Sequence, residues 1–140
     1  MRSLPTIDGA NYLLGLMSNS EPPLSKYHFA VCSVDPGISS SGYDLAEPTD
    51  STYTRAEFEN IDGHWLMGDG VMSTTVDIAF GMADQDWDGI RYWAICDSYE
   101  GGRVLWVGEF SMPVTIPAGD QAILPAGTVS ISLDMFGWNI

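Results

Sequence analysis

The stretch IRYWAICDSYEGGRVLWVGEF, residues 90–110, decides the fold class. Residues 90–97 are rich in the aromatic and β-branched side chains that favour strands, and residues 104–110 repeat that composition. Between them, Gly101-Gly102 supplies residues that tolerate the positive φ angles of a tight reversal. The segment therefore predicts a β-hairpin, and it carries almost no candidate catalytic chemistry.

Two similar turn sequences follow the hairpin. IPAGD at residues 116–120 and LPAGT at residues 124–128 both place Pro ahead of Gly, as turns of the Pro-x-Gly kind prefer. Only short strands fit between and after them. Residues 128–134 alternate apolar and polar side chains, which predicts a strand with Val129, Ile131 and Leu133 on its buried face.

The remaining chain predicts one helix and several more strands. Gly9–Asn19 predicts a helix that Thr6 or Asp8 can cap, with one buried face formed by Ala10, Leu13, Leu14 and Met17 at the i, i+3, i+4, i+7 spacing. Strand-like composition recurs over residues 26–35, 53–58, 65–67 and 76–80. The sequence thus predicts a mainly β fold, an antiparallel β-sandwich or jelly-roll-like domain with one short N-terminal helix.

Length and composition set the limits of the fold. A chain of 140 residues corresponds to a single domain, here residues 1–140, with an N-terminal helical segment at 1–20 and an apolar C-terminal tail at 135–140. No run approaches the roughly 18 apolar residues of a membrane helix. The N-terminus lacks the apolar core of a secretory signal. We expect synthesis in the cytoplasm and no membrane partner.

The charge balance disfavours nucleic acid as a partner. Nineteen acidic residues oppose five basic ones, and the net charge of -14 would repel a phosphate backbone. The acids are scattered along the chain, which is typical of a solvated acidic surface, although docking to a basic partner is an alternative. Pro36–Ser51 is rich in Gly, Ser, Pro and acid, so we expect a long surface loop that offers a contact surface.

The clearest candidate metal site is the sequence DQDWDG at residues 84–89. Asp84, Asp86 and Asp88 match the opening of a calcium-binding loop, but the twelfth position is Ile95 instead of the bidentate Glu. An EF-hand is therefore excluded. A looser calcium site on a β-loop remains an alternative to an exposed acidic turn, and no other cofactor is expected.

The other reactive residues are not arranged for catalysis. His28 and His64 lie at no metal-ligand spacing, and no Gly-x-Ser-x-Gly motif occurs. Carboxylate pairs that could face one another on strands are expected by chance among so many acids: Glu57 with Glu59, and Asp97 with Glu109. We therefore predict that the protein is not an enzyme.

Cysteine and tryptophan side chains are expected to serve mainly in the core. Cys32 and Cys96 each sit in an apolar strand, where a free thiol behaves as a small hydrophobe, although a bridge between neighbouring strands is also possible. The tryptophans could line a carbohydrate-binding face, but in strands they more often anchor a core or an interface (Trp65, Trp87, Trp93, Trp106 and Trp138).

From Tyr53 onward, the order of these motifs resembles a family of small structural proteins of tailed bacteriophages, labelled head-decoration, minor tail or tail-fibre proteins. The positions that carry the resemblance are Tyr53-Thr54-Arg55, Trp65, Gly70, Ile78-Ala79-Phe80, Trp87, Gly89, Ala94–Asp97, Gly101-Gly102, Leu105, Gly119-Asp120, Pro125-Ala126-Gly127 and Ile131–Asp134, with the helix at Gly9–Met17. Two departures are Asp88, which splits a usual Trp-Gly pair, and a longer loop at Pro36–Asp50.

The resemblance implies a virion protein without catalytic residues, whose shared positions determine the fold. Its partners would be capsid or tail proteins, and by analogy it would form a homo-oligomer, a trimer. Our first hypothesis is a capsid decoration or cement protein; the alternatives are a minor tail or fibre-associated protein, and a carbohydrate-binding module. The apolar side chains of the tail are the interface candidates: Phe136, Trp138 and Ile140.

Overall fold

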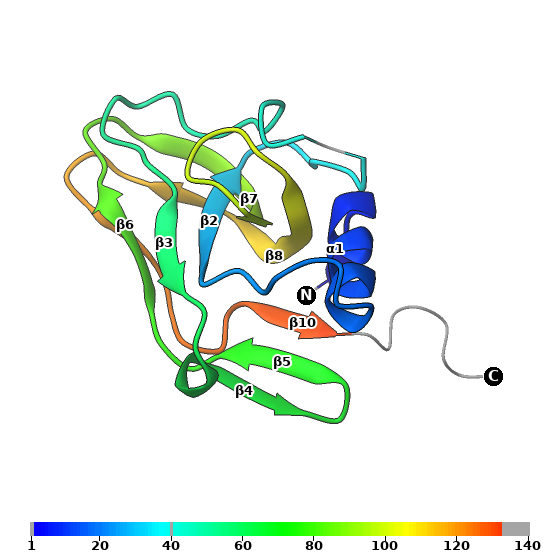
Figure 1. The fold of residues 1–140 in the computed structure, drawn as a ribbon. Helices are drawn as coiled ribbons and strands as arrows, with labels where there is room; N and C mark the ends of the chain where they lie inside the picture. Colours follow the sequence, from blue (N-terminus) through cyan, green and yellow to red (C-terminus); the bar gives the residue numbers. More distant parts are fainter. Residues whose placement is uncertain (1, 40, 133–140) are drawn as a thin grey trace.

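The main sheet contains five antiparallel strands in the order β1-β8-β7-β2-β3 (Figure 1). The structure is a computed structural model that describes residues 2–39 and 41–132. The strands of this sheet are β1 (Arg2–Pro5), β2 (Lys26–Cys32), β3 (Ala56–Glu59), β7 (Trp87–Cys96) and β8 (Val104–Ile116).

Two smaller antiparallel sheets complete the β structure. One has the order β10-β5-β4 and the other pairs β6 with β9. Their strands are β4 (Trp65–Gly68), β5 (Val71–Thr74), β6 (Ile78–Met82), β9 (Gln121–Leu124) and β10 (Ser130–Ser132), and a short 3-10 helix, Asp62–His64, precedes β4. The prediction of a mainly β, antiparallel fold with one N-terminal helix is confirmed.

The larger hydrophobic core lies between the main sheet and the two smaller sheets. Trp93 and Ile95 of β7 point into this core, while Ala94 and Cys96 contribute to a second, smaller cluster on the opposite face. Residues 29–32 of β2 are likewise buried throughout. Since both faces of these central strands are covered, their sequences are almost continuously apolar instead of alternating.

The predicted turns have the expected geometry. In the β7–β8 hairpin, Gly101 and Gly102 have φ angles of 59° and 73°, in the left-handed region that favours glycine. In the two Pro-Ala-Gly turns, the N–H of Asp120 donates to the carbonyl of Pro117, and the N–H of Thr128 donates to that of Pro125, at 3.0 Å each. These reversals are therefore encoded locally, as the sequence indicated.

The helix α1 (Ile7–Met17) begins two residues earlier than predicted and buries a different face. Thr6 is its N-cap and accepts a hydrogen bond from the N–H of Gly9 at 2.9 Å. The predicted inward face was wrong, since Leu14 and Met17 are 62% and 86% exposed. The buried residues of the helix are Gly9, Tyr12 and Gly15.

Close packing explains which face of α1 is buried. A Cβ atom placed on Gly9 would lie 1.7 Å from the carbonyl oxygen of Leu105 in β8. The helix backbone therefore rests directly on β8 at Gly9, where no side chain intervenes, while the side chains of Leu14 and Met17 remain exposed.

Several strand boundaries differ from the predictions. The strand expected at 26–35 ends at Cys32, and the strand expected at 53–58 begins only at Ala56. The edge strand β1, which accommodates Pro5, was not predicted, nor was β5. The expected strand at 128–134 extends beyond the described residues, within which β10 covers Ser130–Ser132.

Candidate functional site

The long connection at residues 36–51 is fixed to the body of the protein by the buried guanidinium of Arg55. Its Nε and Nη2 atoms donate to the two carboxylate oxygens of Glu47 at 2.9 and 3.1 Å. The Arg55 side chain is 3% exposed and that of Glu47 is 20% exposed. The other donors go to backbone carbonyls of the connection and of the β7–β8 turn: Gly42 and Ser98 at 2.8 Å and Gly101 at 2.9 Å. The guanidinium thus joins two separate loops.

The charge state of this cluster suits a structural role. Burial opposes the charged form of Arg55, but the hydrogen bonds to Glu47 and the attraction of nearby acidic groups together outweigh that effect and raise the pKa of Arg55. The hydroxyl of Tyr53 donates to Oε1 of Glu47 at 2.6 Å, and burial followed by the negative charge of Glu47 raises the pKa of Tyr53. Arg55 stays charged and Tyr53 stays protonated at neutral pH, so neither is poised for proton transfer.

Asp50 fixes the end of the same connection. Its buried carboxylate accepts hydrogen bonds from the N–H of Thr52 at 3.0 Å and from the indole N–H of Trp87 at 2.9 Å. The N–H groups of Asp84 and Gln85 donate to it at 2.7 and 2.9 Å. The bond from Thr52, assisted by those from the other donors, holds the pKa of Asp50 well below its usual range despite its burial. This carboxylate is therefore used to organise backbone.

The candidate calcium residues lie on the surface next to that carboxylate. Asp84 contributes its backbone N–H to Asp50, and Oδ1 of Asp86 accepts the N–H of Ala118 at 2.8 Å. Asp88 is exposed. Within residues 2–39 and 41–132, no group of three or more His, Cys, Asp or Glu side chains is placed to hold a metal ion.

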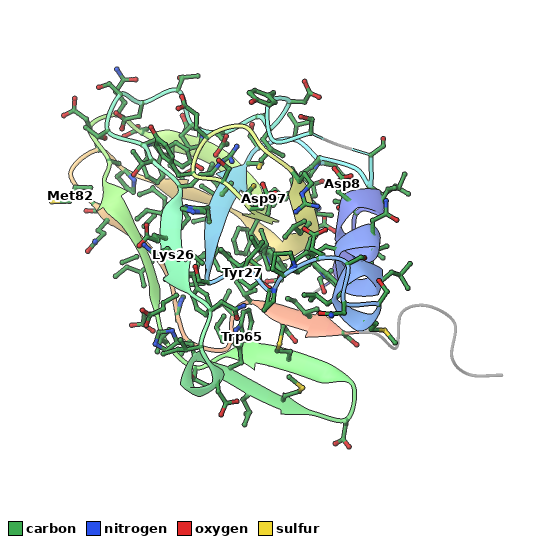
Figure 2. The ribbon with its side chains drawn as sticks, viewed as in Figure 1. Asp8, Lys26, Tyr27, Trp65, Met82 and Asp97 are labelled. Carbon is green, nitrogen blue, oxygen red and sulfur yellow. The ribbon has the colours of Figure 1, made fainter. Side chains whose placement is uncertain are left out.

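Three of the four carboxylates considered as catalytic pairs are bound to cations. Glu57 contacts Lys26 at 3.0 Å, and Glu109 contacts Arg91 at 3.1 Å. The carboxylate of Asp97, labelled in Figure 2, accepts a hydrogen bond from Nε of Arg103 at 2.7 Å. Glu57, Asp97 and Glu109 are therefore each engaged in an ion pair.

The described tryptophans belong to the interior. Trp87, Trp93 and Trp106 are buried, and Trp65 is partly buried. Trp87 packs edge to face against Tyr53 with ring centroids 5.3 Å apart. The part of the chain that the structure describes therefore presents no tryptophan platform of the kind that a carbohydrate-binding face requires.

The cysteine and histidine side chains also have structural surroundings. Cys32 and Cys96 are both free and buried, and in the ladder between β2 and β7 they oppose Tyr92 and His28 instead of each other. Burial raises the pKa of the Cys96 thiol to about 12. Burial lowers the pKa of His28. No reactive thiolate forms at neutral pH.

An apolar pocket of about 620 Å³ opens between α1, the β4–β5 hairpin and the main sheet. Tyr27 lines it from β2, and its ring packs edge to face on Trp65 at 6.4 Å between centroids (Figure 2). Its walls include Tyr12 and Leu13 from α1, Met67 and Met72 from the hairpin, Trp106 from β8 and Ile131 from β10. Its volume is within the range of about 300–1,000 Å³ that is usual for ligand sites.

The helix and the strand that border this pocket also carry exposed apolar side chains. Leu14 and Met17 of α1 and Leu66 and Met67 of β4 are all exposed. The predicted interface residues follow β10 and lie outside the described residues, namely Phe136, Trp138 and Ile140. In residues 2–39 and 41–132, no helix has the length and apolar character needed to cross a membrane.

A sequence model of the family described as "Podophage GP4 fiber I protein gp80" matches residues 10–132. The chain belongs to this family. This match confirms the predicted relationship to structural proteins of tailed-phage virions. The protein is therefore a virion structural protein. No curated protein matches the chain.

The hydrogen bonds around Arg55 and Glu47 and those around Asp50 explain several positions that carry the resemblance to the phage family. Tyr53 and Arg55 meet on Glu47, and Arg55 also binds the carbonyl of Gly101. Trp87 binds Asp50. Sequence reasoning missed Glu47 and Asp50 because each is one acid among many, and only the Tyr-x-Arg motif signalled that a fixed polar arrangement was present.

Proposed function

We propose that the protein is a non-catalytic structural subunit of a podophage fibre. The single observation that carries this proposal is the match of residues 10–132 to a family whose description names a fibre protein. The chain would act as one domain, made in the host cytoplasm and assembled into the virion.

The chemistry of the described residues supports a structural role. The buried ionisable groups Arg55, Glu47 and Asp50 are engaged in hydrogen bonds that fix loops. The exposed apolar side chains of α1 and β4 are suited to protein–protein contact, since aromatic and methionine side chains are enriched at interfaces. The acidic surface keeps the remaining faces solvated.

Location in the particle is the decisive test. An antibody raised against the isolated chain, carrying gold, would be imaged on intact virions by electron microscopy. Gold at the tail fibres supports the proposal. Gold over the head shell alone would refute it and support the competing hypothesis of a capsid decoration protein.

Self-association is the second part of the proposal, with a homotrimer as the expected state. Light scattering on the purified chain measures it directly. We expect Met17→Ser, at a residue of α1 that is 86% exposed, to weaken the oligomer, whereas Met112→Ser, at a residue of β8 that is 71% exposed, serves as the matched control. A monomer at all concentrations would refute self-association of the isolated chain.

A further inference from the structure

We propose that the apolar pocket is the binding site for the segment that follows β10 in the same chain, residues 133–140. The pocket is lined by Ile131, and β10 ends at Ser132, so the segment starts at the rim of the pocket. This inference concerns the isolated chain and holds wherever the protein sits in the virion.

The length and composition of the segment suit the pocket. Its sequence is LDMFGWNI, with five large apolar residues and one glycine that permits a turn. Eight extended residues span about 26 Å, which exceeds the width of a 620 Å³ cavity. Burying these side chains against Leu13, Met67 and Trp106 would remove apolar surface of both partners from water.

Two arguments favour the chain's own segment over that of a second copy. A short tether gives an effective concentration in the millimolar range, so at about 1 μM protein the intramolecular reaction has an advantage of about a thousandfold. Ile131 of β10 also lines the pocket itself, so the residues that follow Ser132 are joined directly to the pocket wall of their own chain.

Disulfide trapping in the full-length chain tests the proposal. Trp138→Cys is combined with Leu13→Cys or with Met67→Cys, both at exposed positions of the pocket wall. The matched control combines Trp138→Cys with Met112→Cys, at a position of β8 that is about as exposed as Met67. The native cysteines, Cys32 and Cys96, are buried, and any cross-linking in the unsubstituted chain gives the background rate.

Each outcome of mild oxidation at about 1 μM protein decides the proposal. We expect an intramolecular disulfide, identified by peptide mass, to form at least about tenfold faster at one of the pocket positions than at Met112. Disulfide-linked dimers at the pocket positions would overturn the proposal in favour of a second copy. Equal rates at pocket and control positions, or no cross-link at any of them, would also overturn it.

An independent readout uses the loss of the apolar side chains. In the full-length chain, Phe136→Ser with Trp138→Ser should raise the binding of a hydrophobic dye and the hydrogen exchange of α1 and the β4–β5 hairpin, because the pocket would be left open. Unchanged dye binding and exchange would contradict the proposal. Circular dichroism checks that the variant remains folded.

Discussion

Replacing Arg55 by methionine should destabilise the fold more than any substitution of an exposed cation. Methionine keeps an unbranched side chain of similar reach but has no N–H donors. The change removes the two hydrogen bonds to Glu47 and leaves three backbone carbonyls without their donors, those of Gly42, Ser98 and Gly101.

The expected magnitude follows from the burial of the pair. Removing one partner of a buried ion pair typically costs about 3–5 kcal/mol, because the remaining charge loses its compensation. The hydroxyl of Tyr53 still donates to Glu47, which limits the loss, while the three carbonyls add to it. We expect the free energy of unfolding to fall by about 3–5 kcal/mol, and Tm to fall by about 10–20 °C.

Urea unfolding followed by circular dichroism measures the change, with Arg91→Met as the matched control. Arg91 pairs with Glu109 at 3.1 Å, and its side chain is 48% exposed, so its replacement should cost less than about 1 kcal/mol. Hydrogen exchange should rise most in residues 41–51 and 98–103. A loss for Arg55→Met no larger than that of the control would refute the assignment of Arg55 as the group that joins the two loops.

Three further predictions concern acid stability, thiol reactivity and helix packing. The native chain should lose stability as the pH falls below about 4, because the hydrogen bonds that depress the pKa of Asp50 stabilise the fold only while the carboxylate is ionised. The Asp50→Asn variant should be less stable than the native chain at neutral pH and should lose less stability on acidification. If the urea midpoints of the two proteins fell by the same amount as the pH is lowered, that result would contradict the argument. Cys32 and Cys96 should react with a thiol reagent at about pH 8 at least about a hundredfold more slowly in the native chain than in urea, since burial raises both thiol pKa values, and equal rates would be incompatible with the buried positions. Gly9→Ala should lower Tm markedly because its Cβ would meet the Leu105 carbonyl, whereas Gly68→Ala, with no atom within 4 Å, should not; similar melting curves would disprove the close packing of α1.

Features encoded by neighbouring residues were predictable from the sequence. The β7–β8 hairpin, the two Pro-Ala-Gly turns and the buried strand β2 depend on local composition and turn chemistry, and all three occur. The helix was also found, but its buried face was not. Apolar periodicity marks large side chains, while α1 rests on Gly9, where the absence of a side chain allows contact with β8.

Features that depend on distant residues were not predictable. Arg55 binds carbonyls of Gly42 and Gly101, and any residue type supplies a backbone carbonyl, so no sequence pattern marks these partners. Asp50 meets Trp87 from 37 positions away. Edge strands of four residues, such as β1, carry too few side chains for a reliable period.

The anchoring of the connection at residues 36–51 also limits how its length can change during evolution or engineering. Gly42, Glu47 and Asp50 are fixed by hydrogen bonds, so an insertion between them would have to break the bonds to Arg55 or Trp87. Pro36 and Gly37 lie ahead of these anchors, and a Cβ on Gly37 would meet no atom within 4 Å. Extra residues are therefore best accommodated between Pro36 and Gly37, where a displayed epitope would leave the rest of the connection in register.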